Sequence, residues 1–100
     1  MSFDVVVRPE AEGDIAEAAA WYDEQQPGVG DEFSDAIEAA IDTLAVTPLI
    51  HAIRIRRKSM RWFVAPRFPY KIIYRIEGDS VVVFAVVHTS RHDRAWLKRI

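Results

Sequence analysis

The fold is decided by one stretch, residues 67–88, which reads RFPYKIIYRIEGDSVVVFAVVH. Apolar residues occupy every second position of its first half, which is the period of a β-strand with one buried face. Residues 77–80 are typical of a tight turn. Residues 81–88 are almost entirely apolar, as in a central strand that is buried on both faces. Pro69 cannot donate to a strand ladder, so we expect an edge position, a bulge or a late start for the first strand.

Three shorter segments are expected to complete the sheet. Residues 3–7 form a short apolar run, residues 53–56 alternate isoleucine with arginine, and residues 61–64 are mostly apolar. The links between the later segments are short, which predicts a meander of mostly antiparallel strands.

Two amphipathic helices are predicted between the first two strands. The first begins at Pro9 and ends before Pro27-Gly28, and the second runs from about residue 31 to residue 45. Their short link predicts an antiparallel hairpin. Residues 93–98 are expected to form a short C-terminal helical segment. We therefore predict an α+β fold: an N-terminal strand, a helix hairpin packed on one face of a small, mostly antiparallel sheet, and this last segment.

The composition limits the domain count and the chemistry. One hundred residues are enough for a single domain, to which we assign residues 1–100. The chain has no cysteine, which excludes disulfides, thiolate metal sites and a cysteine nucleophile. It has neither the basic start of a signal peptide nor a run of about 20 apolar residues for a membrane helix. We expect a cytoplasmic protein without a membrane partner.

The charge is divided between the two halves of the chain. Residues 1–50 contain one basic and 12 acidic residues, a balance of −11, whereas residues 51–100 contain 12 basic and 3 acidic residues, a balance of +9. The structural interpretation is that the two halves attract each other and that the charged helix surface is simply solvated. The functional interpretation is a basic surface that meets a polyanionic or acidic partner.

The basic half interleaves cations with aromatic residues. We expect the following cations to share one face or groove: Arg54, Arg56, Arg57, Lys58, Arg61, Arg67, Lys71, Arg75, Arg91 and Arg94. Trp62, Phe63 and Trp96 are candidate stacking surfaces for unpaired bases, whereas Phe68, Tyr70 and Tyr74 are assigned to the core. No glycine-rich phosphate loop and no histidine cluster with metal-ligand spacing is present, so we predict no metal and no cofactor.

His88 is the titratable residue of most interest. It ends the strand at residues 81–88, where a basic surface would begin, and a histidine there is placed for acid–base chemistry near neutral pH. The alternative, which we favour, is a ring that caps the sheet through a hydrogen bond.

A series of short motifs follows a specific order along nearly the whole chain. They are Trp21-Tyr22, Pro27-Gly28-Val29-Gly30, Phe33, Thr47-Pro48, residues 67–74, Ala85-Val86-Val87-His88, Arg91 and Trp96. This series resembles the RelE/ParE superfamily of type II toxins, and the Arg-Phe-Pro-Tyr block is its most specific part. The resemblance implies a helix hairpin against a small antiparallel sheet, in agreement with the prediction from periodicity.

The resemblance implies two alternative activities. ParE-like members inhibit DNA gyrase, and RelE-like members cleave mRNA in the ribosomal A site. RelE-like sites often hold a tyrosine near the C-terminus, whereas Thr89 and Ser90 follow His88 in this chain. This departure favours the ParE-like branch, whose catalytic residues we leave unassigned. In the nuclease alternative, a metal-independent endoribonuclease that contacts nucleic acid, the centre would be His88, Arg67 and Arg91. A third alternative is an inactive toxin fold that only binds an antitoxin.

The resemblance also implies two binding surfaces. The residues expected to contact the target are Arg61, Arg67, His88, Arg91, Arg94 and Trp96. The expected partner is a ParD-like antitoxin whose C-terminal segment folds on binding. We expect its helix to lie in a groove of small residues on the helix hairpin, with contacts to Trp21, Phe33, Ile37, Arg67 and Arg75.

Overall fold

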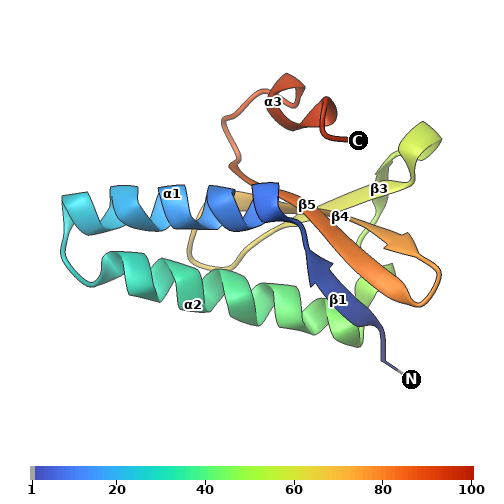
Figure 1. Cartoon of the computed structure of the whole chain (residues 1–100), viewed down its shortest axis with the longest axis horizontal. Helices are drawn as coiled ribbons and strands as arrows, with labels where there is room; N and C mark the ends of the chain where they lie inside the picture. The colour runs from blue at the N-terminus through green and yellow to red at the C-terminus, as the bar shows by residue number, and fades with distance from the viewer. Residues whose placement is uncertain (1) are drawn as a thin grey trace.

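The chain forms a helix hairpin, a five-stranded sheet and a short C-terminal helix in the computed structural model, which describes residues 2–100 (Figure 1). The elements are β1 (Asp4–Val7), α1 (Pro9–Gln25), α2 (Val29–Asp42), β2 (Ile53–Ile55), β3 (Met60–Val64), β4 (Tyr70–Glu77), β5 (Ser80–His88) and α3 (Arg94–Leu97). Single 3₁₀ turns lie at Thr43–Ala45, Pro48–Ile50 and Arg56–Lys58. The α+β prediction is confirmed.

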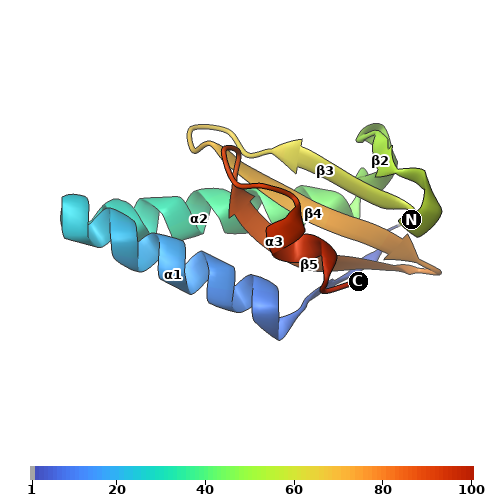
Figure 2. The same ribbon diagram turned by 90° about the horizontal axis from the view of Figure 1, so that it is seen from above.

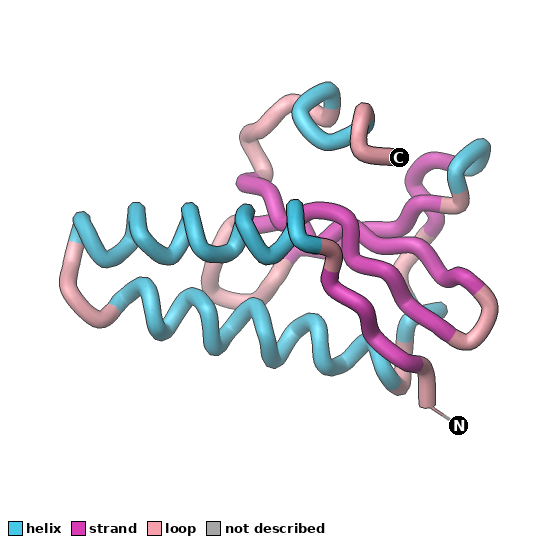
Figure 3. Tube along the Cα trace, in the orientation of Figure 1, coloured by secondary structure: helices cyan, strands magenta, loops and turns pink. Residues whose placement is uncertain are grey.

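The strand order in the sheet is β1-β5-β4-β3-β2. The strands β2 to β5 form the predicted antiparallel meander, and β1 pairs with β5 in parallel. β4 begins directly after Pro69. Of the three expectations for this proline, the late start of the strand is the one that is confirmed. Figure 3 shows the loop before β4 and the tight turn from β4 to β5.

A β-bulge divides β5 into two parts. Ile73 lies opposite Ala85, but the next residue, Tyr74, lies opposite Val83, so Phe84 is the extra residue. The bulge shifts the alternation of side chains by one position. As a result, Phe84 and Ala85 both pack on the face away from the helix hairpin, while Val83 and Val86 face the hairpin.

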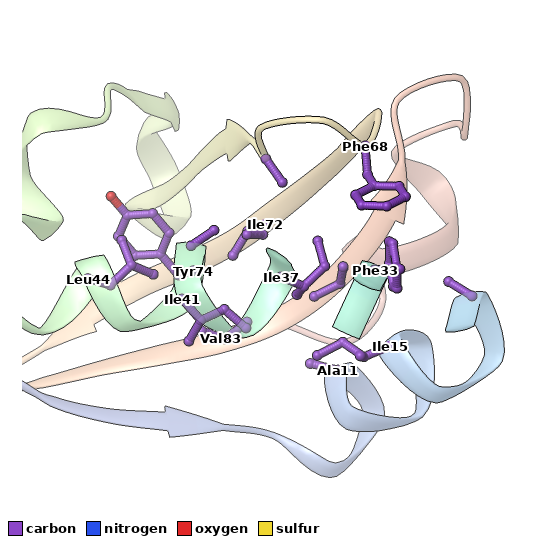
Figure 4. Close-up of a cluster of buried hydrophobic side chains, with 14 of the residues drawn as sticks. Ala11, Ile15, Phe33, Ile37, Ile41, Leu44, Phe68, Ile72, Tyr74 and Val83 are labelled. Carbon is purple, nitrogen blue, oxygen red and sulfur yellow. The ribbon is translucent and has the colours of Figure 1, made fainter. Parts of the chain in front are cut away.

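Two apolar clusters cover the two faces of the sheet. The cluster beneath the hairpin includes Phe33, Ile37, Leu44, Ile72 and Tyr74, all fully buried (Figure 4). The cluster on the opposite face contains Met60, Ile73, Phe84, Ala85, Val87 and Trp96. Figure 2 shows α3 lying over this second face. β5 is therefore buried on both faces, as predicted.

The hairpin turn depends on one close approach between the helices. α2 begins at Val29, two residues earlier than predicted, because Asp23 of α1 accepts hydrogen bonds from the N–H groups of Gly28 (3.2 Å) and Gly30 (2.7 Å). Gly28 has a left-handed φ of 94°. A Cβ at Gly30 would lie 2.4 Å from the Ala19 carbonyl oxygen.

We expect Gly30→Ala to lower the free energy of unfolding by about 2 kcal/mol, because a backbone carbonyl cannot move away from the added methyl. Gly13→Ala is the matched control. A Cβ at Gly13 meets no atom within 4 Å, and alanine in a helix interior is favoured by about 0.5–1 kcal/mol over glycine. Urea unfolding of both variants measures the difference. Equal effects of the two substitutions would contradict the close approach.

Segment 48–51 is tied to the sheet by two hydrogen bonds and by a stacked ring. The Tyr74 hydroxyl donates to the Pro48 carbonyl, and burial raises the pKa of Tyr74 to about 12. The His51 ring stacks on Phe63 with 4.0 Å between ring centroids, and its carbonyl accepts a bond from Arg61 (2.6 Å). Burial, with the charges of Arg54 and Arg61, lowers the pKa of His51.

Candidate functional site

A groove of about 550 Å³ lies between α1, the end of β5 and the C-terminal segment, defined as residues 89–100. One wall is formed by α1, with Glu17 and Trp21, and the other by the C-terminal segment, with Arg91. Residues 86–88 of β5 line the groove between these walls. Figures 1 and 2 show α1 beside β5 and α3 above it.

The groove exists because β1 is shorter than β5. The β1–β5 register ends at Val7 opposite Val83, and the Arg8 N–H closes the ladder on the Val83 carbonyl (3.0 Å). The chain then turns into α1, so β5 continues beyond this point without a strand on that side. The rest of this β5 edge faces side chains of α1 and of the C-terminal segment.

An ion pair fills the beginning of this edge. The Asp14 carboxylate accepts the Val86 N–H (2.9 Å) and two bonds from the Arg99 guanidinium (2.7 and 3.0 Å). Arg99 also donates to the Phe84 carbonyl (3.2 Å). The hydrogen bond that Arg99 donates to Asp14 is the main cause that raises the pKa of Arg99. These contacts join α1, β5 and the C-terminal segment.

Trp96 holds the C-terminal segment on the sheet. Its side chain is fully buried and meets Trp62 edge-on, with 5.6 Å between ring centroids. Asp93, just before α3, accepts hydrogen bonds from Lys71 (2.8 Å) and from the Trp96 indole (3.3 Å). The bond from Lys71 is the main cause that lowers the pKa of Asp93.

His88 lies at the end of β5, beside Tyr70 and in the same groove as Arg91. Its Nδ1 accepts the Ser90 N–H (3.0 Å) and lies 2.8 Å from the Ser90 hydroxyl, so the ring caps the turn after β5. The ring is hydrogen-bonded as expected, but it caps the turn that follows β5 and not the sheet. The Tyr70 and His88 ring centroids are 5.3 Å apart. Burial raises the pKa of Tyr70, and the charge of Arg91 opposes that shift.

Arg91 and Arg94 are exposed, and neither forms an ion pair with any residue in the range 2–100. Arg67 lies in the loop between β3 and β4 with a left-handed φ of 71°, and it pairs with Glu32 of α2 (3.0 Å). The groove thus brings together His88 and Arg91 but does not include Arg67.

Comparison with known proteins identifies the family. Residues 5–93 match the family described as the ParE toxin of the type II toxin–antitoxin system, parDE. The chain belongs to the ParE toxin family. This also bears out the wider resemblance to RelE/ParE toxins. No curated protein matches the sequence closely enough to count as a relative.

A solved structure described as "Chromosomal ParDE TA system from P. aeruginosa" is similar to this ParE-family chain. The match has a TM-score of 0.77 and 15% sequence identity, and covers 86% of this chain and 95% of that chain. At this identity the match supports the fold of the ParE-family chain.

The basic residues of this ParE-family chain do not share one face, which corrects the prediction. Arg61 bonds to the His51 carbonyl on the hairpin side of the sheet, and is half-buried. Arg75 lies on the opposite face, where its guanidinium sits 5.1 Å from the Phe84 ring centroid and pairs with Glu77. Strand alternation separates odd and even positions of β3 and β4, and this divides the cations.

The prediction that three residues of the ParE-family chain contact a partner is wrong, because these residues are fully buried. Phe33 and Ile37 lie in the core beneath the hairpin, and Trp96 lies in the core beneath α3, each with 0% exposure. A partner cannot reach them, and a base cannot stack on Trp96. Trp21, in contrast, is 53% exposed, which confirms only that its side chain is at the surface.

The predicted helix groove on the hairpin is replaced by a small hollow of about 170 Å³. This hollow lies between the helices and is lined partly by the acidic residues Glu12, Glu38 and Asp42. Two of the small residues that were expected to form the groove, Ala18 and Ala40, are buried. The larger concave surface of the ParE-family chain is on the other side of α1.

Two features of the groove were missed in the sequence. Tyr70 was assigned to the core, but it is half-buried beside His88, and its register position opposite His88 could have indicated this. The Asp14–Arg99 pair joins residues 85 positions apart, and no local pattern signals it.

Within residues 2–100, no group of three or more histidine, cysteine or acidic side chains is arranged to hold a metal ion. None of the helices described in the ParE-family chain is long and apolar enough to cross a membrane.

Proposed function

We propose that this chain inhibits DNA gyrase and is neutralised by direct binding of a ParD-like antitoxin in the cytoplasm. The match of residues 5–93 to the ParE toxin family carries the proposal. The description of the similar P. aeruginosa structure as a ParDE system supports an antitoxin partner.

Four exposed or half-exposed residues are proposed to contact the target: Arg67, His88, Arg91 and Arg94. Arg91 and Arg94 have no carboxylate partner within residues 2–100, and the Arg67–Glu32 pair is exposed on both sides, so its attraction is weak. Exposed cations attract an acidic surface over long range and fix its orientation. Arg61 and Trp96 are left out because both are held in structural contacts.

The test is a double substitution, Arg67→Ala with Arg91→Ala. We expect at least a tenfold loss of gyrase inhibition in a supercoiling assay with the purified protein, and loss of growth arrest in cells. The matched control is Arg57→Ala with Lys98→Ala, which removes two other exposed cations and should leave inhibition unchanged. Circular dichroism checks the fold of both.

Three other outcomes would each lead to a different conclusion. Full inhibition by the folded Arg67→Ala/Arg91→Ala variant would overturn the proposed surface. If the chain does not inhibit gyrase but cuts ribosome-bound mRNA at codon positions, the target is mRNA and not gyrase. If expression of the folded, unsubstituted chain is harmless to cells, the chain is an inactive toxin fold and antitoxin binding is the one proposed activity that remains.

The second candidate function is a RelE-like, metal-independent endoribonuclease, and one observation favours it. Tyr70 and His88 lie with ring centroids 5.3 Å apart, in the same groove as Arg91. Such a group offers an acid, a base and a cation for phosphodiester cleavage. Purified ribosomes with mRNA test it: Tyr70→Phe and His88→Ala should each abolish cleavage. Cleavage at the full rate by both variants would exclude this centre.

A further inference from the structure

The free edge of β5 carries two backbone groups without a partner among residues 2–100. Tyr70 lies opposite His88, but its N–H and C=O bond to Phe68 and Ala65 on the other side of β4. The His88 N–H therefore points away from β4 and into the groove. Val86, two residues earlier, donates its N–H to Asp14 on the groove side, so its C=O points there too.

These two groups have the spacing that a parallel neighbour requires. In a parallel ladder, one residue of the new strand donates to the C=O of residue i−1 and accepts from the N–H of residue i+1. Val86 C=O and His88 N–H meet this condition, with Val87 as residue i. β1 already runs parallel to β5 on the same edge.

In an antiparallel ladder, each hydrogen-bonded pair uses both the N–H and the C=O of the same residue of β5. Neither residue offers both groups. The Val86 N–H is bound to Asp14, and the His88 C=O accepts the Arg91 N–H (2.9 Å). An antiparallel strand would therefore make only one of the two bonds of each pair, whereas a single residue of a parallel strand satisfies both free groups, so the native contacts favour a parallel strand.

The shape of the groove favours a single extended segment. The edge lies between α1 and the C-terminal segment, which line the groove on both sides, so an extended segment reaches it more easily than the sheet edge of a second copy of this chain. A segment that is disordered when free can enter such a space and gain order from main-chain hydrogen bonds.

The side chains around the edge define the chemistry of the segment. A residue opposite Val87 would point toward the α3 side, where Arg91 and Ala95 line the groove. Its two neighbours would point toward the hairpin side, where Ala18 and Tyr22 lie. Apolar residues of the segment therefore suit the hairpin side of the groove. An acidic residue suits the α3 side, because Arg91 has no carboxylate partner within residues 2–100.

We propose that an extended segment of the antitoxin binds in this groove as a parallel strand added to β5 at Val86–His88, with an acidic side chain beside Arg91 and apolar side chains against α1. The proposal rests on the antitoxin partner of the proposed function. It assigns that partner a groove on the sheet edge in place of the hairpin groove expected from the sequence.

The first test uses overlapping 15-residue peptides from the C-terminal half of the ParD-like antitoxin encoded beside this chain. We expect one peptide to bind and to slow amide hydrogen exchange of His88 at least tenfold. Backbone N-methylation along that peptide should weaken binding at least tenfold at the residue opposite Val87, whose N–H is directed at the free Val86 carbonyl, and much less at its two neighbours, whose N–H groups point away from β5. A uniform loss, or none, would overturn the added strand.

The second test uses variants of the chain. His88→Ala keeps the backbone N–H, whereas His88→Pro removes it at an edge position, where proline is tolerated. We expect the proline variant to bind at least tenfold more weakly than the alanine variant. If His88→Pro does not fold, the N-methyl scan still decides. Arg91→Glu should weaken binding at least tenfold, whereas Lys98→Glu, an exposed cation outside the groove, should change it less than twofold.

Failure of this inference is distinguishable from failure of the proposed function. If the full-length antitoxin binds and neutralises the chain while the His88 amide stays unprotected, the added strand is wrong and the antitoxin partner stands. If the full-length antitoxin does not bind, the added strand and the antitoxin partner are both overturned.

Discussion

Trp96→Ala is expected to lower the free energy of unfolding by about 4 kcal/mol. The indole is fully buried among residues of β3, β4 and β5, and it meets Trp62 edge-on. Alanine at this position removes the apolar contacts and leaves a cavity that a helix as short as Arg94–Leu97 cannot close. A domain of this size has a total stability of about 5–15 kcal/mol, so the loss is a large part of it.

The neighbouring residue provides the control for Trp96. Leu97 is 38% exposed, and we expect Leu97→Ala to cost less than about 1 kcal/mol. Urea unfolding followed by far-UV circular dichroism measures both variants. Hydrogen exchange of residues 94–100 should also accelerate in Trp96→Ala, because the indole fixes this segment on the sheet. Similar losses for the two variants would mean that α3 does not pack as described.

The architecture was predictable because its signals are local. Alternation in residues 67–76, the turn at residues 77–80 and the apolar run at residues 81–88 each specify a strand or turn over a few residues. Pro27-Gly28 marks the end of α1 in the same way. The extra residue Phe84 was not predictable, because both faces of β5 are apolar and a shift of one position leaves no trace in such a run.

The site was less predictable because its contacts are between distant residues. Sequence patterns could not show that Arg67 pairs with Glu32, or that Arg61 bonds to the His51 carbonyl, so the cations were expected on one surface. Phe33 and Ile37 were placed in the helix stripe correctly. Their assignment to a partner failed because a stripe facing the core is the same pattern as a stripe facing a partner.

Asp14→Ala is expected to lower the free energy of unfolding by about 3 kcal/mol, because it breaks the contacts that close the beginning of the groove. The Asp14 side chain is only 16% exposed, and its loss leaves the Val86 N–H without an acceptor and the Arg99 guanidinium with the Phe84 carbonyl alone. Asp14→Asn keeps an acceptor for the Val86 N–H but loses the charge, so we expect a smaller loss of about 1–2 kcal/mol. Glu12→Ala, an exposed acid on the same helix, should cost less than about 1 kcal/mol.

A double-mutant cycle with Arg99→Ala separates the ion pair from the backbone bond. We expect a coupling energy above about 1 kcal/mol between Asp14 and Arg99, since their side chains meet in two hydrogen bonds with little solvent around them. The remaining part of the Asp14→Ala loss belongs to Val86, whose amide should exchange faster in this variant. The Val87 amide, which faces β4, should be unaffected. Coupling near zero with unchanged exchange at Val86 would show that Asp14 does not hold this edge, and that the groove is shaped by packing alone.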